Sequence, residues 1–138
     1  MKRTVQMTLA AVVILASVVA IGAQQGAAPA STGFKRIPVQ QADLSVPGRE
    51  VVQAIAEIQP GAESGRHTHP GEEVTYVLEG AVTLEFQGKP SVTKKAGEAF
   101  IIPPNTVHNA KNTGKTVAKA IATYIIEKGK PVTTPVTQ

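Results

Sequence analysis

The stretch from Gly61 to Gly80, which reads GAESGRHTHPGEEVTYVLEG, constrains this chain more than any other. It contains His67 and His69, two of the three histidines in the protein, and Glu73 follows four residues later. Side chains at i and i+2 of an extended strand point to the same side. Glu73 shares that parity if the chain turns briefly at Pro70-Gly71 and re-enters a strand. Two imidazoles and a carboxylate that converge suit a divalent metal such as Mn, Fe, Ni or Zn.

The third histidine, His108, lies in a second informative stretch, Gly97 to Asn112, which reads GEAFIIPPNTVHNAKN. Its Pro103-Pro104-Asn105 segment predicts a rigid turn that aims His108 from a short strand of its own. The alternative is that the histidines are ordinary surface or core residues, because a lone histidine or an HxH pair is weak support for a metal. However, no histidine lies outside these two stretches.

Together the two stretches resemble the paired motifs of the cupin family. The first motif is matched at every spaced position by Gly61-x5-His67-x-His69-x3-Glu73-x6-Gly80. The second is matched by Gly97-x5-Pro103-x-Asn105-x2-His108-x3-Asn112, with Asn105 where the family usually has glycine. Because asparagine tolerates positive φ better than other non-glycine residues, we expect the turn to survive.

The resemblance covers roughly residues 51–126. It implies a cupin double-stranded β-helix, an all-β jelly-roll barrel, with His67, His69, Glu73 and His108 as metal ligands. The rest of the sequence agrees with an all-β fold, because many short β-rich runs are separated by Gly, Pro and Asn turn signals. We therefore expect one cupin β-barrel domain over residues 34–127, followed by a loose C-terminal tail over residues 128–138.

Strand periodicity predicts which side chains face inward. In the strand from Arg49 to Gln59 one face carries Val52, Ala54, Ala56 and Ile58, and in the strand from Ala81 to Gln87 one face carries Val82, Leu84 and Phe86. If Glu73 faces the metal, Thr75 and Val77 line the same cavity. We expect a mostly apolar pocket lined by Thr75, Val77, Val82, Leu84 and Phe100 or Ile102. Val74, Tyr76 and Leu78 then form an outward-facing apolar stripe that needs a cover. We expect a homodimer contact there; the alternative is that an edge strand over residues 34–39 covers the stripe.

The N-terminus has the layout of a secretory signal peptide. A basic start, Met1-Lys-Arg, precedes an apolar run from Met7 to Ala23. We expect cleavage near Ala23–Gln24, a flexible spacer over residues 24–33, and a periplasmic or secreted mature protein. The alternative is an uncleaved membrane anchor. The run is short for a membrane span and no basic flank follows it, so we expect no stable membrane insertion after processing.

Composition excludes several classes of function. The 138 residues suffice for one domain with a sizeable core. The net charge of +4 includes Lys2 and Arg3, and without them 12 Lys and Arg face 10 Asp and Glu, a net of +2. That charge is too small to suggest nucleic-acid binding. The chain has no cysteine, which excludes disulfides, thiolate ligands and a cysteine nucleophile.

The predicted site leaves two functions open. Four protein ligands on an ion that prefers six leave room for water, dioxygen or a substrate. The first function is a metal-dependent enzyme acting on a small organic molecule, such as an oxygenase, isomerase or lyase, with a quercetinase-like dioxygenase as the most specific version. The second is a non-catalytic protein that binds or sequesters a small ligand. We identify no catalytic residue beyond the ligands, and interpret Tyr76 and Tyr124 as packing residues and Glu72 as a solvated rim residue.

Overall fold

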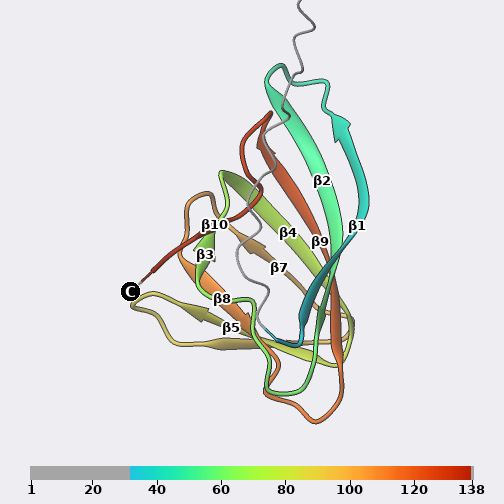
Figure 1. The fold of residues 1–138 in the computed structure, drawn as a ribbon, viewed down its shortest axis with the longest axis vertical. Coiled ribbons are helices and arrows are strands. Elements are labelled where there is room, and N and C mark those ends of the chain that lie inside the picture. Colours follow the sequence, from blue (N-terminus) through green and yellow to red (C-terminus); the bar gives the residue numbers. More distant parts are fainter. Residues whose placement is uncertain (1–31, 138) are drawn as a thin grey trace, which may run out of the picture.

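Two antiparallel sheets pack face to face in the computed structural model, which describes residues 32–137 (Figure 1). The first, sheet A, contains in spatial order β1 (Phe34–Asp43), β2 (Arg49–Ile58), β9 (Ala118–Glu127), β4 (Gly71–Glu79) and β7 (Ala99–Ile102). The second, sheet B, contains β10 (Thr134–Pro135), β3 (His67–Thr68), β8 (His108–Lys111), β5 (Ala81–Phe86) and β6 (Val92–Lys95). The all-β prediction is confirmed. The predicted signal peptide and nearly all of the predicted spacer lie outside the described residues.

The described part of the chain contains no helix long and apolar enough to cross a membrane. Its main core cluster lies between the two sheets, where the predicted alternation places apolar side chains inward. Sheet A contributes Ile58, Val77, Ile102, Ala118 and Ala120, and sheet B contributes Val82 and Leu84. Burial of this apolar surface is the dominant favourable term in folding a small barrel.

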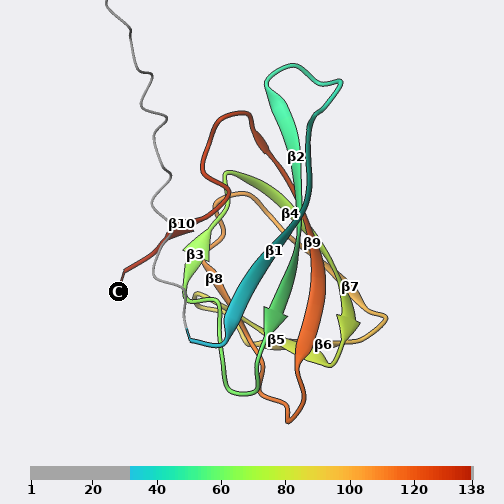
Figure 2. The ribbon, with the colours of Figure 1, turned by 45° about the vertical axis from the view of Figure 1, so that its right-hand side comes forward.

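The strand β4 shows the predicted alternation clearly. Glu73, Thr75 and Val77 are buried, whereas Val74, Tyr76 and Leu78 are 39%, 47% and 43% exposed. The strand β1 lies at the edge of sheet A, separated from β4 by β2 and β9 (Figure 2). It therefore extends the sheet and does not cover the apolar stripe, so the alternative in which residues 34–39 form that cover is wrong.

The second cupin-like stretch is tied to the first at both ends. Asn105 adopts φ of 57°, as predicted for the turn, and its N–H donates to the His69 carbonyl at 2.8 Å. At the other end, the N–H of Gly61 donates to the Asn112 carbonyl at 2.8 Å, and the N–H of Asn112 donates to the Ala62 carbonyl at 3.0 Å. These bonds fix the strand β8 relative to the chain around β3.

The expectation of a loose C-terminal tail is wrong for the residues described there. The strand β10 pairs with β3 through Thr134↔Thr68 and Pro135↔His67, and the N–H of Val136 donates to the Arg66 carbonyl at 2.9 Å. The short strand β3 has β8 on one side, so the tail satisfies backbone groups on its other side. A sequence rich in Thr, Pro and Val gives turn signals but does not reveal a two-residue pairing of this kind.

Candidate metal centre

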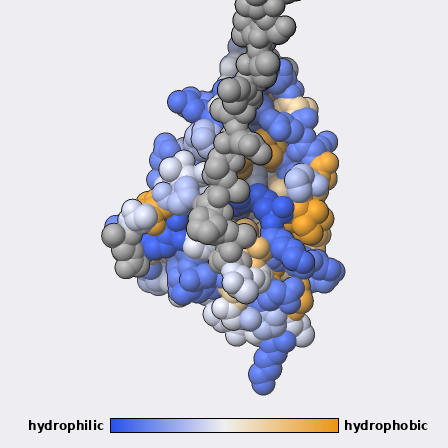
Figure 3. Space-filling view, in the orientation of Figure 1, coloured by the Kyte–Doolittle hydropathy of each residue, from blue (hydrophilic) through white to orange (hydrophobic). Residues whose placement is uncertain are grey.

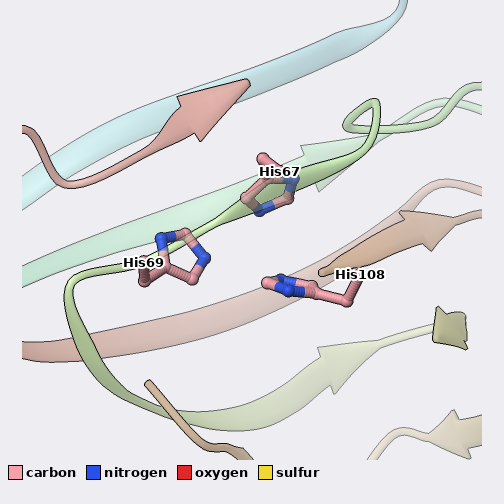
Figure 4. Close-up of side chains that lie close together, drawn as sticks. All are labelled: His67, His69 and His108. Carbon is pink, nitrogen blue, oxygen red and sulfur yellow. The ribbon is translucent and has the colours of Figure 1, made fainter. Parts of the chain in front are cut away.

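Three imidazoles meet between the sheets (Figure 4). His67 lies on β3, His69 lies one residue beyond that strand, and His108 lies on β8. Ring centroids are 4.7 Å apart for His67 and His69, 4.3 Å for His67 and His108, and 5.1 Å for His69 and His108. One ring nitrogen from each lies within 4.8 Å of the others. All three residues are buried.

Local backbone geometry explains this convergence. The strands β3 and β8 pair so that His67 lies directly opposite His108, and directly paired residues project to the same face. The predicted turn at Pro70-Gly71 follows, and Gly71 begins β4 against β9. A Cβ at Gly71 would lie 1.9 Å from the Ile125 carbonyl oxygen, so only glycine fits where the chain crosses from the histidines into sheet A.

Each imidazole is held by a backbone carbonyl through its Nδ1 atom. His67 Nδ1 donates to Gly65 O at 2.7 Å, His69 Nδ1 to Val132 O at 2.6 Å, and His108 Nδ1 to Thr106 O at 2.9 Å. Because a carbonyl oxygen can only accept, each Nδ1 must carry the proton. In the neutral imidazoles the Nε2 atoms are therefore free lone-pair donors, the arrangement expected of metal-binding histidines.

Glu73 approaches the same point from β4. Its Oε2 atom lies 2.9 Å from His69 Nε2 and 3.4 Å from His108 Nε2, and its Oε1 atom accepts a hydrogen bond from the Thr75 hydroxyl at 2.7 Å. Burial raises the pKa of Glu73, but interactions with His108, His69 and Thr75 outweigh it and hold the pKa below its usual range. Positive charge beside Glu73, from protons on the imidazoles or from a bound ion, therefore keeps the carboxylate ionised at neutral pH.

The donor set fits a divalent cation. His69 Nε2 is buried and makes no hydrogen bond, although it lies 2.9 Å from a carboxylate oxygen. A lone pair and an anionic oxygen at this distance repel each other unless a proton or a metal ion neutralises them. The structure thus brings together all four residues that the sequence predicted as ligands: three histidines form the cluster and Glu73 contacts two of them.

Two neighbours of the site were not anticipated. Tyr124 on β9 pairs with Glu73, and its ring centroid lies 4.7 Å from that of His69. It packs, as predicted, but its place beside the site follows from the register of β4 and β9, which the sequence alone does not give. Burial, with Glu73 adding to it, raises the pKa of Tyr124 to about 12. The second neighbour is the Val132 carbonyl, in the tail that was expected to be loose.

The other residues considered from the sequence lie in different surroundings. Glu72 is exposed on the opposite side of β4, as predicted. Val77, Val82, Leu84 and Ile102 were expected to line a pocket, but they belong to the close-packed core. Two residues of the predicted lining lie next to Glu73: Thr75 donates a hydrogen bond to it, and Ile102 of β7 pairs with it across the sheet.

Comparison with known proteins agrees with this fold and site. The structure resembles a double-stranded β-helix protein from Klebsiella pneumoniae, with a TM-score of 0.63, 20% identity, and 80% of this chain and 90% of that chain covered. It also resembles an oxalate oxidase solved in complex with the substrate analogue glycolate, with a TM-score of 0.60, 24% identity, and 75% and 55% covered. The fold is thus the double-stranded β-helix predicted from the sequence.

The model of the cupin domain family matches residues 54–124, and the chain belongs to the cupin family. A curated relative, germin-like protein subfamily 2 member 2 of Arabidopsis thaliana, is 37% identical over 87 residues. This match includes 57% of the chain described here and 40% of the relative. The chain therefore spans less than half the length of that plant protein.

The buried His67 predicts a pH-dependent stability. Burial, followed by the positive charge of His108, lowers its pKa from 6.5 to about 3. Between these values the unfolded chain binds a proton that the folded chain does not, so the metal-free protein should lose stability as pH falls below 6.5. The slope is at most about 1.4 kcal/mol per pH unit for one group. The pKa of Glu73 is lowered on folding, so stability should fall further as the pH drops below about 4.5.

Urea unfolding of chelator-treated protein at pH 7 and pH 5 measures this effect. The His67→Asn variant is the matched control, because an amide can still donate to Gly65 but does not titrate in this range. Its stability should change less with pH. An equal free energy of unfolding at both pH values in the parent protein would contradict the prediction.

Proposed function

We propose that this protein holds one divalent transition metal through His67, His69, Glu73 and His108 and acts through it on a small organic molecule. The observation that carries the proposal is the set of three Nδ1–carbonyl hydrogen bonds, which leaves three Nε2 lone pairs beside an ionised carboxylate. Imidazole and carboxylate donors suit Mn, Fe, Ni or Zn. A bound ion of this type would polarise a ligand oxygen and lower the pKa of bound water.

The protein's own residues fix the ligands and surround them with packed side chains. Thr75 orients Glu73 through a hydrogen bond, and three backbone carbonyls orient the imidazoles. Tyr124 keeps its proton at neutral pH, because its pKa is raised to about 12. It can donate a hydrogen bond to a ligand beside His69 but cannot act as a base there. Dioxygenase-type chemistry, which relies chiefly on the metal and dioxygen, is the most specific form of the proposal.

Non-catalytic binding is the second candidate. The observation that favours it is that Tyr124, whose ring lies beside that of His69, keeps its proton near neutrality and so cannot act as a base. Elemental analysis of protein purified from its native compartment separates the two candidates. Redox-active Fe or Mn supports oxygenase chemistry, whereas Zn points to hydrolytic, isomerase or binding roles. The complex of the similar oxalate oxidase with glycolate supports a small ligand.

We also propose that the mature protein is exported and forms a homodimer through sheet A. The apolar stripe of β4 continues across the sheet, because Tyr76 pairs with Ile121 of β9, Ile121 with Ile55 of β2, and Ile55 with Ile37 of β1. Hydrophobic side chains are exposed along the right-hand border in Figure 3, where strands of sheet A run. A second copy would remove this surface from water.

The metal proposal predicts unequal effects of substitution. His69→Ala and His108→Ala each remove a direct ligand. Each should lower metal affinity by more than the roughly 10–100-fold that is typical when a residue hydrogen-bonded to a ligand is replaced. Glu73→Gln keeps the shape but removes the charge, so its loss should be smaller. All three variants should still fold from the apolar core. Chelator competition and elemental analysis measure affinity and stoichiometry.

Glu72→Gln is the matched control, because it removes a neighbouring carboxylate on the outer side of the same strand. It should leave metal affinity unchanged. A His108→Ala protein that retains one equivalent of metal as tightly as the parent would show that the four-residue site is wrong.

The export proposal predicts a processed N-terminus. The basic start and the apolar run through Ala23 should direct cleavage before Gln24. Intact-mass measurement of protein recovered outside the cytoplasm should give a chain that begins near Gln24. Exported protein that retains residues 1–23 would contradict this proposal.

The dimer proposal predicts a two-copy assembly at micromolar concentration in sedimentation experiments. Tyr76→Glu should shift the protein to monomers, because a charge would be buried at the centre of the contact. Val92→Glu is the control, since Val92 is 44% exposed but lies on β6 of the other sheet. A monomeric parent protein, or a dimer unaffected by Tyr76→Glu, would argue against this interface.

A further inference from the structure

Arg36 lies on the inner face of sheet A, on the strand β1. It pairs with Ala56 of β2, and Ala56 pairs with Ala120 of β9. Because these paired neighbours are alanines, their short side chains leave room for a long one. The guanidinium carbon of Arg36 lies 5.8 Å from the ring centroid of Tyr124 and 5.7 Å from that of Phe34. The cation is therefore directed toward the wall of the metal centre.

The distance from Arg36 to the ligand histidines is short. The ring centroid of Tyr124 lies 4.7 Å from that of His69. The guanidinium carbon therefore lies no more than 10.5 Å from the centre of the His69 ring, the sum of the two distances through Tyr124. A groove of about 290 Å³ also runs beside Arg36, lined by residues of β1 and β2 that include Val52 and Ala54. None of the four predicted ligands lines this groove, so a molecule that contacts both Arg36 and the metal would extend beyond it.

The charge of Arg36 has no carboxylate partner in residues 32–137. The ion pairs of this region involve Lys35, Lys111, Lys119 and Lys128, and two contacts between histidines and Glu73. Arg36 is exposed, so its planar fork of N–H donors remains accessible. Contact with the aromatic rings uses the face of the guanidinium, and its edge also interacts with the Tyr124 hydroxyl, which leaves the remaining N–H groups for a ligand. Those groups match a carboxylate in a bidentate arrangement.

We propose that Arg36 is a positioning residue that binds the anionic end of the ligand. The ligand is then a small organic acid, with a carboxylate for Arg36 and a second oxygen-bearing group for the metal. This inference rests on the proposed metal site, because it assigns the second group to the ion. It adds a charge requirement that the metal ligands alone do not impose. The charge of Arg36 also acts on His67, where it is the smallest contribution to the lowered pKa, after burial, His108 and His69.

Isothermal titration of the metal-loaded protein with succinamate and with succinamide tests this role. Succinamate has one carboxylate for Arg36 and an amide oxygen for the metal, and succinamide replaces that carboxylate by a neutral amide of similar size. The parent protein should bind succinamate at least about tenfold more tightly, which corresponds to about 1.4 kcal/mol. Arg36→Gln and Arg36→Met should abolish this preference with unchanged metal content, and Arg36→Met retains the apolar stem in case packing matters for folding. Arg36→Lys should retain part of the preference.

Lys35→Gln is the matched control, because it removes the same charge from the next residue of β1. Lys35 has its ammonium 4.0 Å from Glu57 on the other side of the strand, so its loss should leave the preference intact. Equal binding of the two probes by the parent, or a preference that survives in both neutral Arg36 variants, would overturn the role of Arg36 with the metal site unaffected. Parent protein that retains no metal would overturn the proposed function, and the role of Arg36 with it.

Discussion

Three hydrogen bonds from imidazole Nδ1 atoms to backbone carbonyls are the interactions on which the candidate site depends. They fix the tautomer and the orientation of each ring, so that the three Nε2 lone pairs face the same small volume. The carbonyls come from the chain before β3, the turn before β8 and the C-terminal tail. A site assembled from segments so far apart in sequence requires the whole barrel to be folded before it can bind an ion.

The folded barrel brings these segments together because its two sheets meet at the site. His67, His69 and His108 come from sheet B and the turn that follows β3, whereas Glu73 and Tyr124 come from sheet A. Asn105 joins the two motifs through its bond to the His69 carbonyl, and the tail closes the other side through Val132. The apolar core lies further along the same strands, so ligand geometry and barrel stability are set by neighbouring but different residues.

The sequence was sufficient to predict the fold and the positions that would carry ligands, because period-two alternation and motif spacing are local properties. Glu73, Thr75 and Val77 face inward and Val74, Tyr76 and Leu78 outward, as their parity requires. Tyr124, Arg36 and the Val132 carbonyl were not anticipated as neighbours of the site. The positions of Tyr124 and Arg36 depend on strand order and register. The Val132 carbonyl is a backbone group, so the side-chain pattern of the sequence does not reveal its role. Four of the residues expected to line an apolar pocket, Val77, Val82, Leu84 and Ile102, pack together in the core, because side chains fill the interior of a small barrel.

The convergence of four donors on one ion can be tested by anomalous X-ray diffraction from crystals of the metal-loaded protein, with data collected on both sides of the absorption edge of the metal. A single anomalous peak is predicted, bound by Nε2 of His67, His69 and His108 and by a carboxylate oxygen of Glu73, at about 2.0–2.2 Å. A peak bound elsewhere, coordination through Nδ1 of any of the three histidines, or the absence of any peak between the sheets would contradict the prediction.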